Sequence, residues 1–410
     1  MVSKQMKTLP IALCILSLLS ASTIKAHAAD TPILLGQSAA FSGGASHFGQ
    51  QTWLGAETYF EELNRNGGIN GRPIQVIVKD DAYNPDLTEK NTKDFIAQSD
   101  LFALFSYVGT PTVVKALPLI AKSREEKSGL FLFANRTGAK QQRTPPYDEM
   151  VFNIRAPYSD EGEAIVKSLA ARKKSRVGIF IQDDAYGQSG KAALQAALDK
   201  RGLSILGEEK YQRGAKFSES MQAQAKKLQE LKVDAIVSIA SYAPAAAFIR
   251  DARDAGFKGP IVNISFVGAQ DMLNLLIEAG KQAKRDYTKE ILVSQILPPL
   301  SQKTISVVKE YLDLTEKHLP KIPDAISHGE EVKHTSIGGL EGFVNAKVFA
   351  AIAKKAKQPL TRESFLAAAN DNFSLDLGLS EPVRFSAKDH QGLHLVWMTE
   401  VKKGQFVLEN

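Results

Sequence analysis

The sequence predicts an α/β protein of two lobes, each with a parallel β-sheet at its centre and crossover helices around it. Short β-rich apolar runs alternate with amphipathic stretches, a pattern typical of parallel strands joined by helices. Two such series follow one another, and the polar segment Gln141 to Glu149 separates them. The length of 410 residues is consistent with this division, since it predicts two or three domains of roughly 150 residues each.

The first series contains strands and helices in strict alternation. Trp53, Ala56, Phe60 and Leu63 recur at helical spacing, and Asn66-Gly67-Gly68 ends that helix. Strands are expected at Ile33–Gly36, Ile74–Val78, Phe102–Phe105 and Leu130–Phe133, with further helices ending near Gln98 and covering Thr112–Ala121.

The second series opens with the run Val151–Arg155 and repeats the pattern. Strands are expected at Val177–Ile181, Ala235–Ile239 and Ile261–Ile264, with a less regular strand at Ile205–Tyr211. Helices are expected near Gly190–Arg201, Ser218–Leu231, Pro244–Ala255 and Val267–Ala279.

The last third does not begin a third lobe. A strand at Ile291–Leu297 ends in Pro298-Pro299, and helices at Thr304–His318 and Ile337–Lys357 precede a terminal hairpin of Leu393–Met398 and Gln405–Leu408. We interpret these pieces as completing the two lobes. The predicted first lobe is 29–155 with 298–335 and parts of the C-terminal region; the second is 156–297 with the remainder of that region.

Residues 1–28 have the pattern of a signal peptide. Lys4 and Lys7 precede the apolar run Leu9–Leu19, and Ala26-His27-Ala28 is a small-residue cleavage site. The apolar run is far shorter than the ~20 residues of a spanning helix. We therefore expect an exported, soluble mature chain that begins at Ala29 or one residue later.

The composition excludes several classes of protein. The only cysteine, Cys14, lies within the predicted signal, so the mature chain would make no disulfide and have no Cys nucleophile. Cleavage would lower the formal charge from +6 to +3, and no basic run is interleaved with aromatic residues. We expect no nucleic-acid partner.

Catalytic and metal-binding motifs are also missing from the sequence. It contains no G-x-S-x-G, H-E-x-x-H, Walker or G-x-G-x-x-G motif. Gly187–Lys191 is interpreted as a helix start capped by Ser189, and Ser306 with Lys309 as chance spacing on a helix. His328, Glu330, Glu331 and His334 are interpreted as a solvated loop, and His390 and His394 as surface histidines. We expect no enzyme, no metal and no cofactor.

Polar residues gather where the predicted strands end. Asp80-Asp81 and Asp183-Asp184 each follow a strand, where paired carboxylates either cap turns or do acid–base work. Hydroxyls, amides and aromatic rings follow other strands, in Ser106–Thr112, Asn135–Gly138, Tyr186-Gly187, Ser241-Tyr242 and Ser265-Phe266. Open α/β sheets bind ligands outside these strand ends. The pattern predicts a pocket for a small polar or anionic ligand.

Six short motifs in order resemble those of one family. They are the loop from Gly36-Gln37-Ser38 to Gly49, Gly67–Gly71, Asp80-Asp81-Ala82, Tyr107–Thr112, Asp184–Gly187 and Leu340–Phe343. In this order they resemble the periplasmic solute-binding proteins of ABC importers, specifically the leucine/isoleucine/valine-binding family. The resemblance covers nearly all of the mature sequence.

The resemblance implies two Rossmann-like lobes that are joined by three crossings and close on a ligand, the type I periplasmic binding protein fold. The crossings would fall near Arg155, Leu297 and Thr335. It also implies a periplasmic location and a membrane permease as partner. We expect the protein to be a monomer.

The resemblance also assigns the site residues. The ligand's carboxylate would be held at Thr110, Asn135 and Thr137, and aromatic cover would come from Phe48, Tyr186 and Tyr242. Amino-acid binders of the family generally place an acid at the position of Ser265, where it pairs with the ligand's ammonium group. A serine cannot neutralise that charge, although Asp183 or Asp184 could substitute.

The expected ligand is a branched-chain or related amino acid. An aliphatic or aromatic acid without an amine is the alternative, because of Ser265. A sensor that delivers its ligand to a membrane receptor, and an α/β hydrolase using Ser189, are alternatives of other classes.

Overall fold

The computed structural model describes residues 1–2, 31–126, 129–329 and 332–409. The predicted signal peptide, apart from its first two residues, lies outside the described residues, and so do Glu330 and Glu331.

The first lobe is built on a five-stranded sheet in which all strands are parallel. Its strands are β1 (Ile33–Ala39), β2 (Ile74–Asp80), β3 (Leu101–Phe105), β4 (Leu132–Phe133) and β5 (Val151–Phe152), in the spatial order β2-β1-β3-β4-β5. Its helices are α1 (His47–Arg65), α2 (Pro85–Ile96), α3 (Thr110–Glu125), α9 (Ser306–His318), α10 (Asp324–Ser327), α11 (Ile337–Lys355) and α12 (Arg362–Asn370), with a small hairpin of β11 (Phe373–Leu375) and β12 (Val383–Phe385).

The second lobe has a seven-stranded sheet with a parallel core and an antiparallel edge. Its strands are β6 (Val177–Gln182), β7 (Ile205–Tyr211), β8 (Ala235–Ile239), β9 (Ile261–Asn263), β10 (Ile291–Gln295), β13 (Trp397–Lys402) and β14 (Gln405–Leu408), in the order β14-β13-β10-β9-β8-β6-β7. Its helices are α4 (Tyr158–Ala171), α5 (Ala185–Asp199), α6 (Gln222–Glu230), α7 (Tyr242–Asp254) and α8 (Ala269–Ala283).

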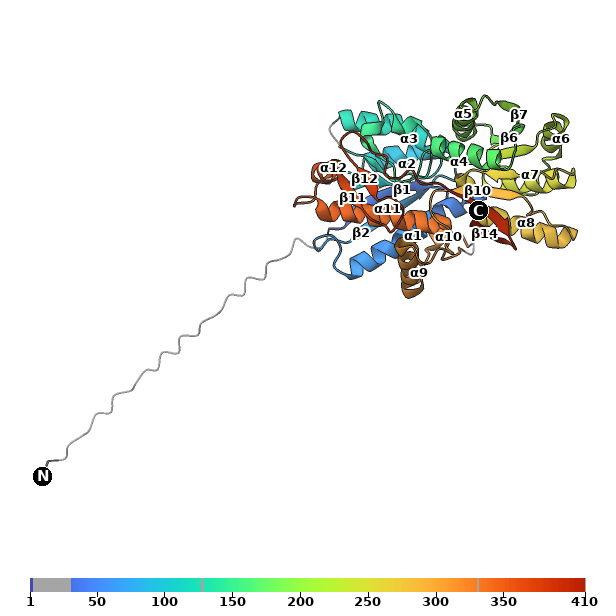
Figure 1. Cartoon of the computed structure of the whole chain (residues 1–410). Helices are drawn as coiled ribbons and strands as arrows, with labels where there is room; N and C mark the ends of the chain where they lie inside the picture. Colours follow the sequence, from blue (N-terminus) through green and yellow to red (C-terminus); the bar gives the residue numbers. More distant parts are fainter. Residues whose placement is uncertain (3–30, 127–128, 330–331, 410) are drawn as a thin grey trace.

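The two lobes lie side by side, with α3, α11 and α12 in one and α5 to α8 in the other (Figure 1). The predicted α/β class with parallel-core sheets is confirmed. One element differs from its predicted place. The run that begins at Val151 pairs with β4 and so completes the first sheet, whereas the second series starts with α4.

The chain crosses between the lobes at three places. The first is near Arg155 and the second near Leu297, because β5 lies in the first sheet, β10 in the second, and α9 in the first lobe. The third lies just before Trp397 and not near Thr335. α11 and α12 stay in the first lobe, since their apolar faces pack into the same core as α1 and β3. Crossing segments pair directly, with Gly392 N donating to Asn153 O at 2.6 Å.

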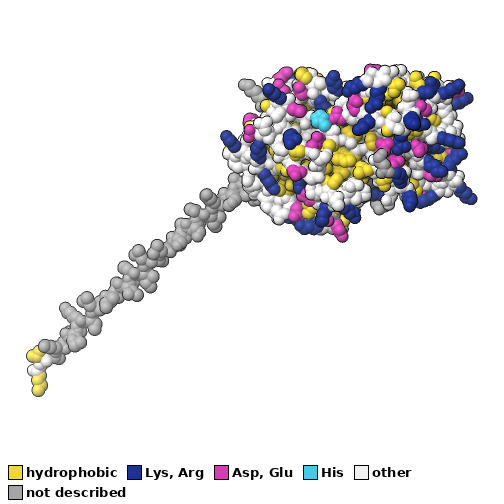
Figure 2. Space-filling model, in the orientation of Figure 1, with side chains coloured by type: hydrophobic (Ala, Val, Ile, Leu, Met, Phe, Trp, Pro, Cys, Tyr) yellow, Lys and Arg dark blue, Asp and Glu magenta, His cyan; other side chains and the backbone are white. Residues whose placement is uncertain are grey.

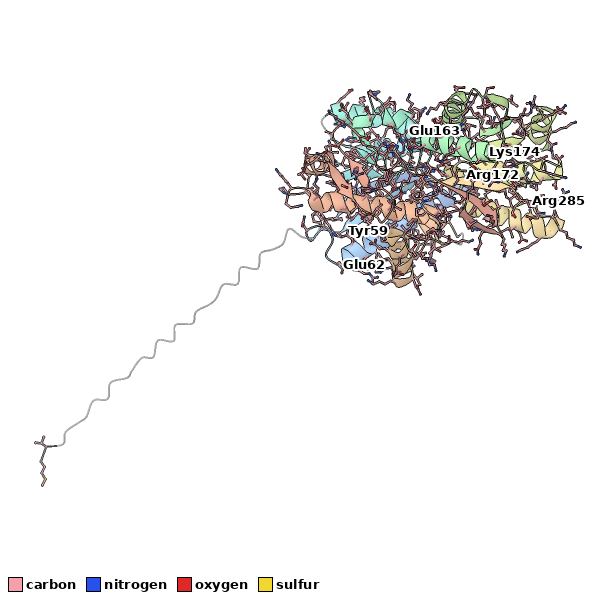
Figure 3. The ribbon with its side chains drawn as sticks, viewed as in Figure 1. Tyr59, Glu62, Glu163, Arg172, Lys174 and Arg285 are labelled. Carbon is pink, nitrogen blue, oxygen red and sulfur yellow. The ribbon has the colours of Figure 1, made fainter. Side chains whose placement is uncertain are left out.

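The terminal hairpin is present, but its first strand is Trp397–Lys402 and not the predicted Leu393–Met398. It is tied to the second lobe by charge. Arg172, labelled in Figure 3, places Nε 2.8 Å from Glu409 Oε1 and Nη2 3.3 Å from Glu400 Oε2. Acidic and basic side chains are interspersed over the visible face of the molecule (Figure 2).

Helices α1 and α11 touch at glycines. A Cβ atom at Gly55 would lie 1.7 Å from the carbonyl oxygen of Gly339, and one at Gly342 would lie 1.9 Å from that of Thr52. This backbone contact sets how deeply α11, and with it Glu341, reaches toward the second lobe.

We predict that Gly55→Ala lowers the free energy of unfolding by about 2 kcal/mol or more, because overpacking forces the two helices apart. Denaturant unfolding measures the change. Gly44→Ala is the control, since its Cβ would have only the carbonyl oxygen of Gly214 nearby, at 4.0 Å. Equal stability of the two variants would contradict the close helix contact.

Candidate functional site

Hydroxyl groups from both lobes meet where two strands of the first sheet end. Thr110 begins α3 directly after the β3 loop, and Thr137 follows β4. Their Oγ1 atoms are 2.6 Å apart, and Thr110 Oγ1 lies 3.4 Å from the hydroxyl of Tyr158, the first residue of α4. All three side chains are buried. The helix N-terminus and three hydroxyls together offer hydrogen bonds to an anionic group.

Gly109 is required for this approach of α3. Its φ of +103° is one that residues with a side chain rarely adopt, and a Cβ there would lie 2.2 Å from the ring of Tyr83. The left-handed backbone therefore turns Thr110 toward the second lobe.

An aromatic cluster lies between the lobes. Phe48 on α1 packs against Tyr242 with ring centroids 5.4 Å apart and against Phe266 at 4.7 Å. Tyr186 lies 4.8 Å from Phe266 and 5.9 Å from Tyr158. The three predicted aromatic residues are thus brought together through Phe266 and Tyr158. The sequence analysis placed Phe266 at a strand end of the predicted pocket without assigning it a ligand contact, and it did not identify Tyr158.

Asn135 is buried but is engaged within the first lobe. Its Nδ2 donates to Asn153 Oδ1 at 3.0 Å, and its Oδ1 accepts from Gln142 Nε2 at 3.2 Å. These bonds occupy both the nitrogen and the oxygen of the amide and hold the loop after β4.

Ser265 lies beside a buried glutamate. Its backbone N–H donates to Glu161 Oε2 at 2.9 Å, its hydroxyl donates to Glu161 Oε1 at 2.8 Å, and it accepts a bond from Arg155 Nη2. Ser294 donates to the same carboxylate at 2.6 Å. Burial raises the pKa of Glu161, and the nearby charge of Arg155 opposes that rise.

The arginine beside Ser265 belongs to an ion network that joins the lobes. Arg155 Nη1 lies 2.9 and 3.0 Å from the two carboxylate oxygens of Glu341 on α11. Arg136 Nε lies 3.3 Å from Glu341 Oε2, and its guanidinium lies 5.0 Å from the centre of the Phe48 ring. The sequence analysis missed this network, although Arg136 stands between two of its site residues.

The paired aspartates have structural roles. Asp81 is buried and accepts hydrogen bonds from Ser38, Thr88 and the backbone of Tyr83. Asp184 caps α5 by accepting from the backbone of Tyr186.

The other two aspartates also hold local structure. Asp80 accepts from the backbone of Phe41 at 2.8 Å, and Asp183 forms a surface ion pair with Lys210 at 3.0 Å. Asp183 is therefore turned away from the site.

The other candidate motifs occupy ordinary structural positions. Ser306 Oγ donates to the carbonyl of Leu377, and His390 lies between Asp148 O and Asn370 Oδ1. His394 is 2.7 Å from Asp160 Oδ2. Across the described ranges, no three His, Cys, Asp or Glu side chains gather as metal ligands. No helix in those ranges is long and apolar enough to cross a membrane.

A cavity of about 160 Å³ opens between the lobes next to the aromatic cluster. Its lining comes from Gly44, Ala45 and Ala82–Asn84 of the first lobe and Arg213–Ala215 and Ser241 of the second. Tyr83 forms part of this wall and its ring lies 6.1 Å from that of Phe266. The cavity therefore lies beside the aromatic cluster. A larger cavity, of about 480 Å³, lies elsewhere, beside β11 and β12.

Comparison with known proteins agrees with the fold and the resemblance. A family model described as periplasmic binding protein matches residues 32–405. The Leu/Ile/Val-binding protein of Escherichia coli K12 is 22% identical over 248 residues, which are 60% of this chain and 64% of that protein. The match thus spans a little under two thirds of the length of this relative. The matched family and relatives are binding proteins and not enzymes, as predicted.

Solved structures have the same fold. A possible leucine/isoleucine/valine-binding protein from Rhodopirellula baltica has a TM-score of 0.80 at 26% identity, covering 93% of this chain and 96% of that one. A branched-chain amino acid ABC transporter protein from Thermus thermophilus with bound valine has a TM-score of 0.78 at 18% identity, with coverage of 93% and 96%. The second likeness concerns the fold alone.

We predict that Glu341→Gln lowers the free energy of unfolding by about 3 to 5 kcal/mol, because it leaves two buried guanidinium groups without their shared carboxylate. Denaturant unfolding is the measurement. Glu61→Gln, which breaks an exposed pair with Arg65, should change stability by less than about 1 kcal/mol. Similar losses in both variants would show that the buried network contributes no more to stability than an exposed ion pair does.

The buried carboxyl group of Asp81 should make the stability of the protein depend on pH. Burial raises the pKa of Asp81 from 3.8 to about 7, so the folded protein keeps a proton that the unfolded chain has released. Its stabilising contribution is complete below pH 4 and is lost as the pH rises through 7.

We expect the wild-type protein to lose stability relative to Asp81→Asn as the pH rises from 4 to 8, because the amide cannot ionise. Unfolding curves at several pH values measure this difference. A constant difference would mean that Asp81 is ionised in the folded protein throughout this range.

Proposed function

The chain belongs to the periplasmic binding protein family, and from this premise we propose that it is the substrate-binding component of an ABC importer. It would bind a small carboxylate-bearing solute between its lobes. The proposal includes a periplasmic location after signal cleavage, a membrane permease as partner and a monomeric state.

The observation that carries the proposal is the meeting of Thr110 and Thr137 of the first lobe with Tyr158 of the second. A carboxylate that replaces the Thr–Thr contact would accept bonds from these hydroxyls. Bonds to a charged group contribute on the order of 1.5 to 3 kcal/mol each, and micromolar affinity needs about 8 kcal/mol.

The placement of these groups couples binding to closure. Phe48 comes from the first lobe, whereas Tyr186 and Tyr242 come from the second, so a ligand that touches all three favours the closed arrangement. A ligand shifts such an equilibrium only through contacts that the open form lacks.

A branched-chain or related amino acid is the first candidate ligand, supported by the names of the relatives. An aliphatic or aromatic acid without an amine is the second. It is supported by Ser265, whose hydroxyl and backbone N–H are already bonded to Glu161. Delivery of the ligand to a receptor in place of a permease is a further alternative, which co-purification with either membrane partner would decide.

We predict that Thr137→Ala weakens binding of the carboxylate ligand at least tenfold, since it removes one hydroxyl from the anion site. Titration calorimetry with a ligand found by thermal-shift screening measures this. Thr144→Ala, in the same loop, is the control because, within the described residues, its hydroxyl contacts just the carbonyls of Lys140 and Gln141, at 3.4 Å. Equal affinities for Thr137→Ala and the parent protein would refute the site.

A further inference from the structure

Five charged side chains are buried around the site or in the adjoining hinge, and a sixth, Arg143, is half-buried there. The cations are Arg136, Arg143 and Arg155, and the carboxylates are Glu161, Asp271 and Glu341. Within the described residues, Arg143 donates to uncharged oxygens, namely the carbonyls of Thr137, Ala139 and Arg155 and the side chain of Gln391. The three positive and three negative formal charges of this group balance, so it has no surplus carboxylate for an incoming cation.

Each carboxylate already has partners on both oxygens. Both oxygens of Glu341 accept hydrogen bonds from Arg155, and the carboxylate also forms an ion pair with Arg136. The oxygens of Glu161 accept hydrogen bonds from the hydroxyl groups of Ser265 and Ser294.

The third carboxylate, that of Asp271, lies against the residues that flank Phe48 on α1. Asp271 contacts His47 at 3.0 Å through Oδ1 and Gln51 at 3.1 Å through Oδ2. An ammonium group buried between the lobes would have to displace one of these contacts, and an unpaired buried charge is costly.

The cations, in contrast, retain unused donors. Arg136 Nη1 donates to Phe48 O at 3.3 Å and to Thr52 Oγ1 at 3.1 Å. Its Nε is buried without a hydrogen bond, although Glu341 lies close. Within the described residues, Nη2 makes no hydrogen bond either. A guanidinium that is 3% exposed thus presents donors beside Phe48, next in sequence to Thr137.

Arg155 places a second guanidinium in the opposite wall, where it offsets the charge of Glu161. It reaches from the first crossing to Ser265 of the second lobe, which is also bonded to Glu161, while Glu341 holds its other nitrogen. Ser265 precedes Phe266, which lies at the centre of the aromatic cluster. An ammonium group at this end of the cleft would face a guanidinium as well as a carboxylate that is already compensated.

Resting on the proposed function, we propose that the cleft selects an organic anion that has no ammonium group, and that Arg136 is the residue that determines this specificity. The bound anion would accept hydrogen bonds from Nε and Nη2 of Arg136, the two donors that lack an acceptor among the described residues. Arg155 is a positioning residue, because it orients Glu341 against Arg136 and offsets the negative charge of Glu161 at the Ser265 end of the cleft.

The test compares matched ligand pairs with and without the amine. The pairs are L-valine with 3-methylbutanoate, L-leucine with 4-methylpentanoate, and L-phenylalanine with 3-phenylpropanoate. Thermal shift and titration calorimetry on the mature protein measure binding. We expect at least one acid to bind at least tenfold more tightly than its amino-acid counterpart.

Arg136→Gln should weaken binding of that acid at least tenfold and reduce the preference over the amino acid. Arg253→Gln is the matched control. It removes the same charge from a half-buried guanidinium that likewise lies over a phenylalanine ring, that of Phe257, but away from the cleft, and it should change affinity less than twofold. An unchanged preference in Arg136→Gln would overturn the role of Arg136. Should Arg136→Gln fail to fold, the ligand affinities of Arg136→Lys and the ligand preference of the parent protein still test the proposal.

Two outcomes separate this inference from the proposed function. Tighter binding of the amino acids, lost in Asp271→Asn, would overturn the inference and keep the proposed function, with Asp271 as the ammonium partner. Binding of neither series would count against a carboxylate site altogether, and both proposals would fail.

Discussion

The buried pair of Arg155 and Glu341 is the interaction on which the arrangement of the lobes depends. Arg155 lies on the first crossing, and its side chain bonds to α11 of the first lobe and to Ser265 of the second. Two ions removed from water are tolerated only with good geometry and further hydrogen bonds. The need to satisfy this arginine therefore constrains both lobes at once.

The constraint is transmitted through close packing. Helices α1 and α11 touch backbone to backbone at Gly55 and Gly339, so Glu341 cannot shift along the groove without a clash. The same α1 carries Phe48 under the guanidinium of Arg136. Hinge, charge network and aromatic cluster are thus parts of one packed unit, and a ligand that alters any of them acts on closure. Protein interiors transmit such shifts because they are close-packed.

Parallel topology explains why the site residues meet at all. The carboxyl ends of β3 and β4 lie at the same edge of the first sheet, which brings Thr110 and Thr137 within 2.6 Å although 27 positions separate them. The second lobe presents its own strand ends, with Tyr186, Tyr242 and Phe266, toward that edge. Two sheets facing each other in this way make a cleft whose walls are loops and helix N-termini.

Prediction from sequence succeeded where the signal is local. Alternating apolar runs identified most strands and helices, and the terminal hairpin followed from its two-residue period. α4 and α12 were missed. The third crossing was misplaced because the apolar residues after 336 give no sign of which lobe they pack against. Of the predicted site residues, Thr110 contacts Thr137, and Phe48, Tyr186 and Tyr242 lie in one aromatic cluster. Asn135 is bonded to Asn153 and Gln142, and Ser265 to Glu161 and Arg155.

The sequence by itself determined the α/β class, the two series of parallel strands and the polar strand ends, because these depend on periodicity and on neighbours in the chain. Tertiary structure alone decided the charge chemistry of the cleft. Arg136, Arg155, Glu161 and Glu341 are scattered over 206 positions, and each is an ordinary charged residue in its own segment. Their burial and pairing arise only when α4, α11 and the first crossing pack together, since desolvation makes each charge depend on partners distant in the chain.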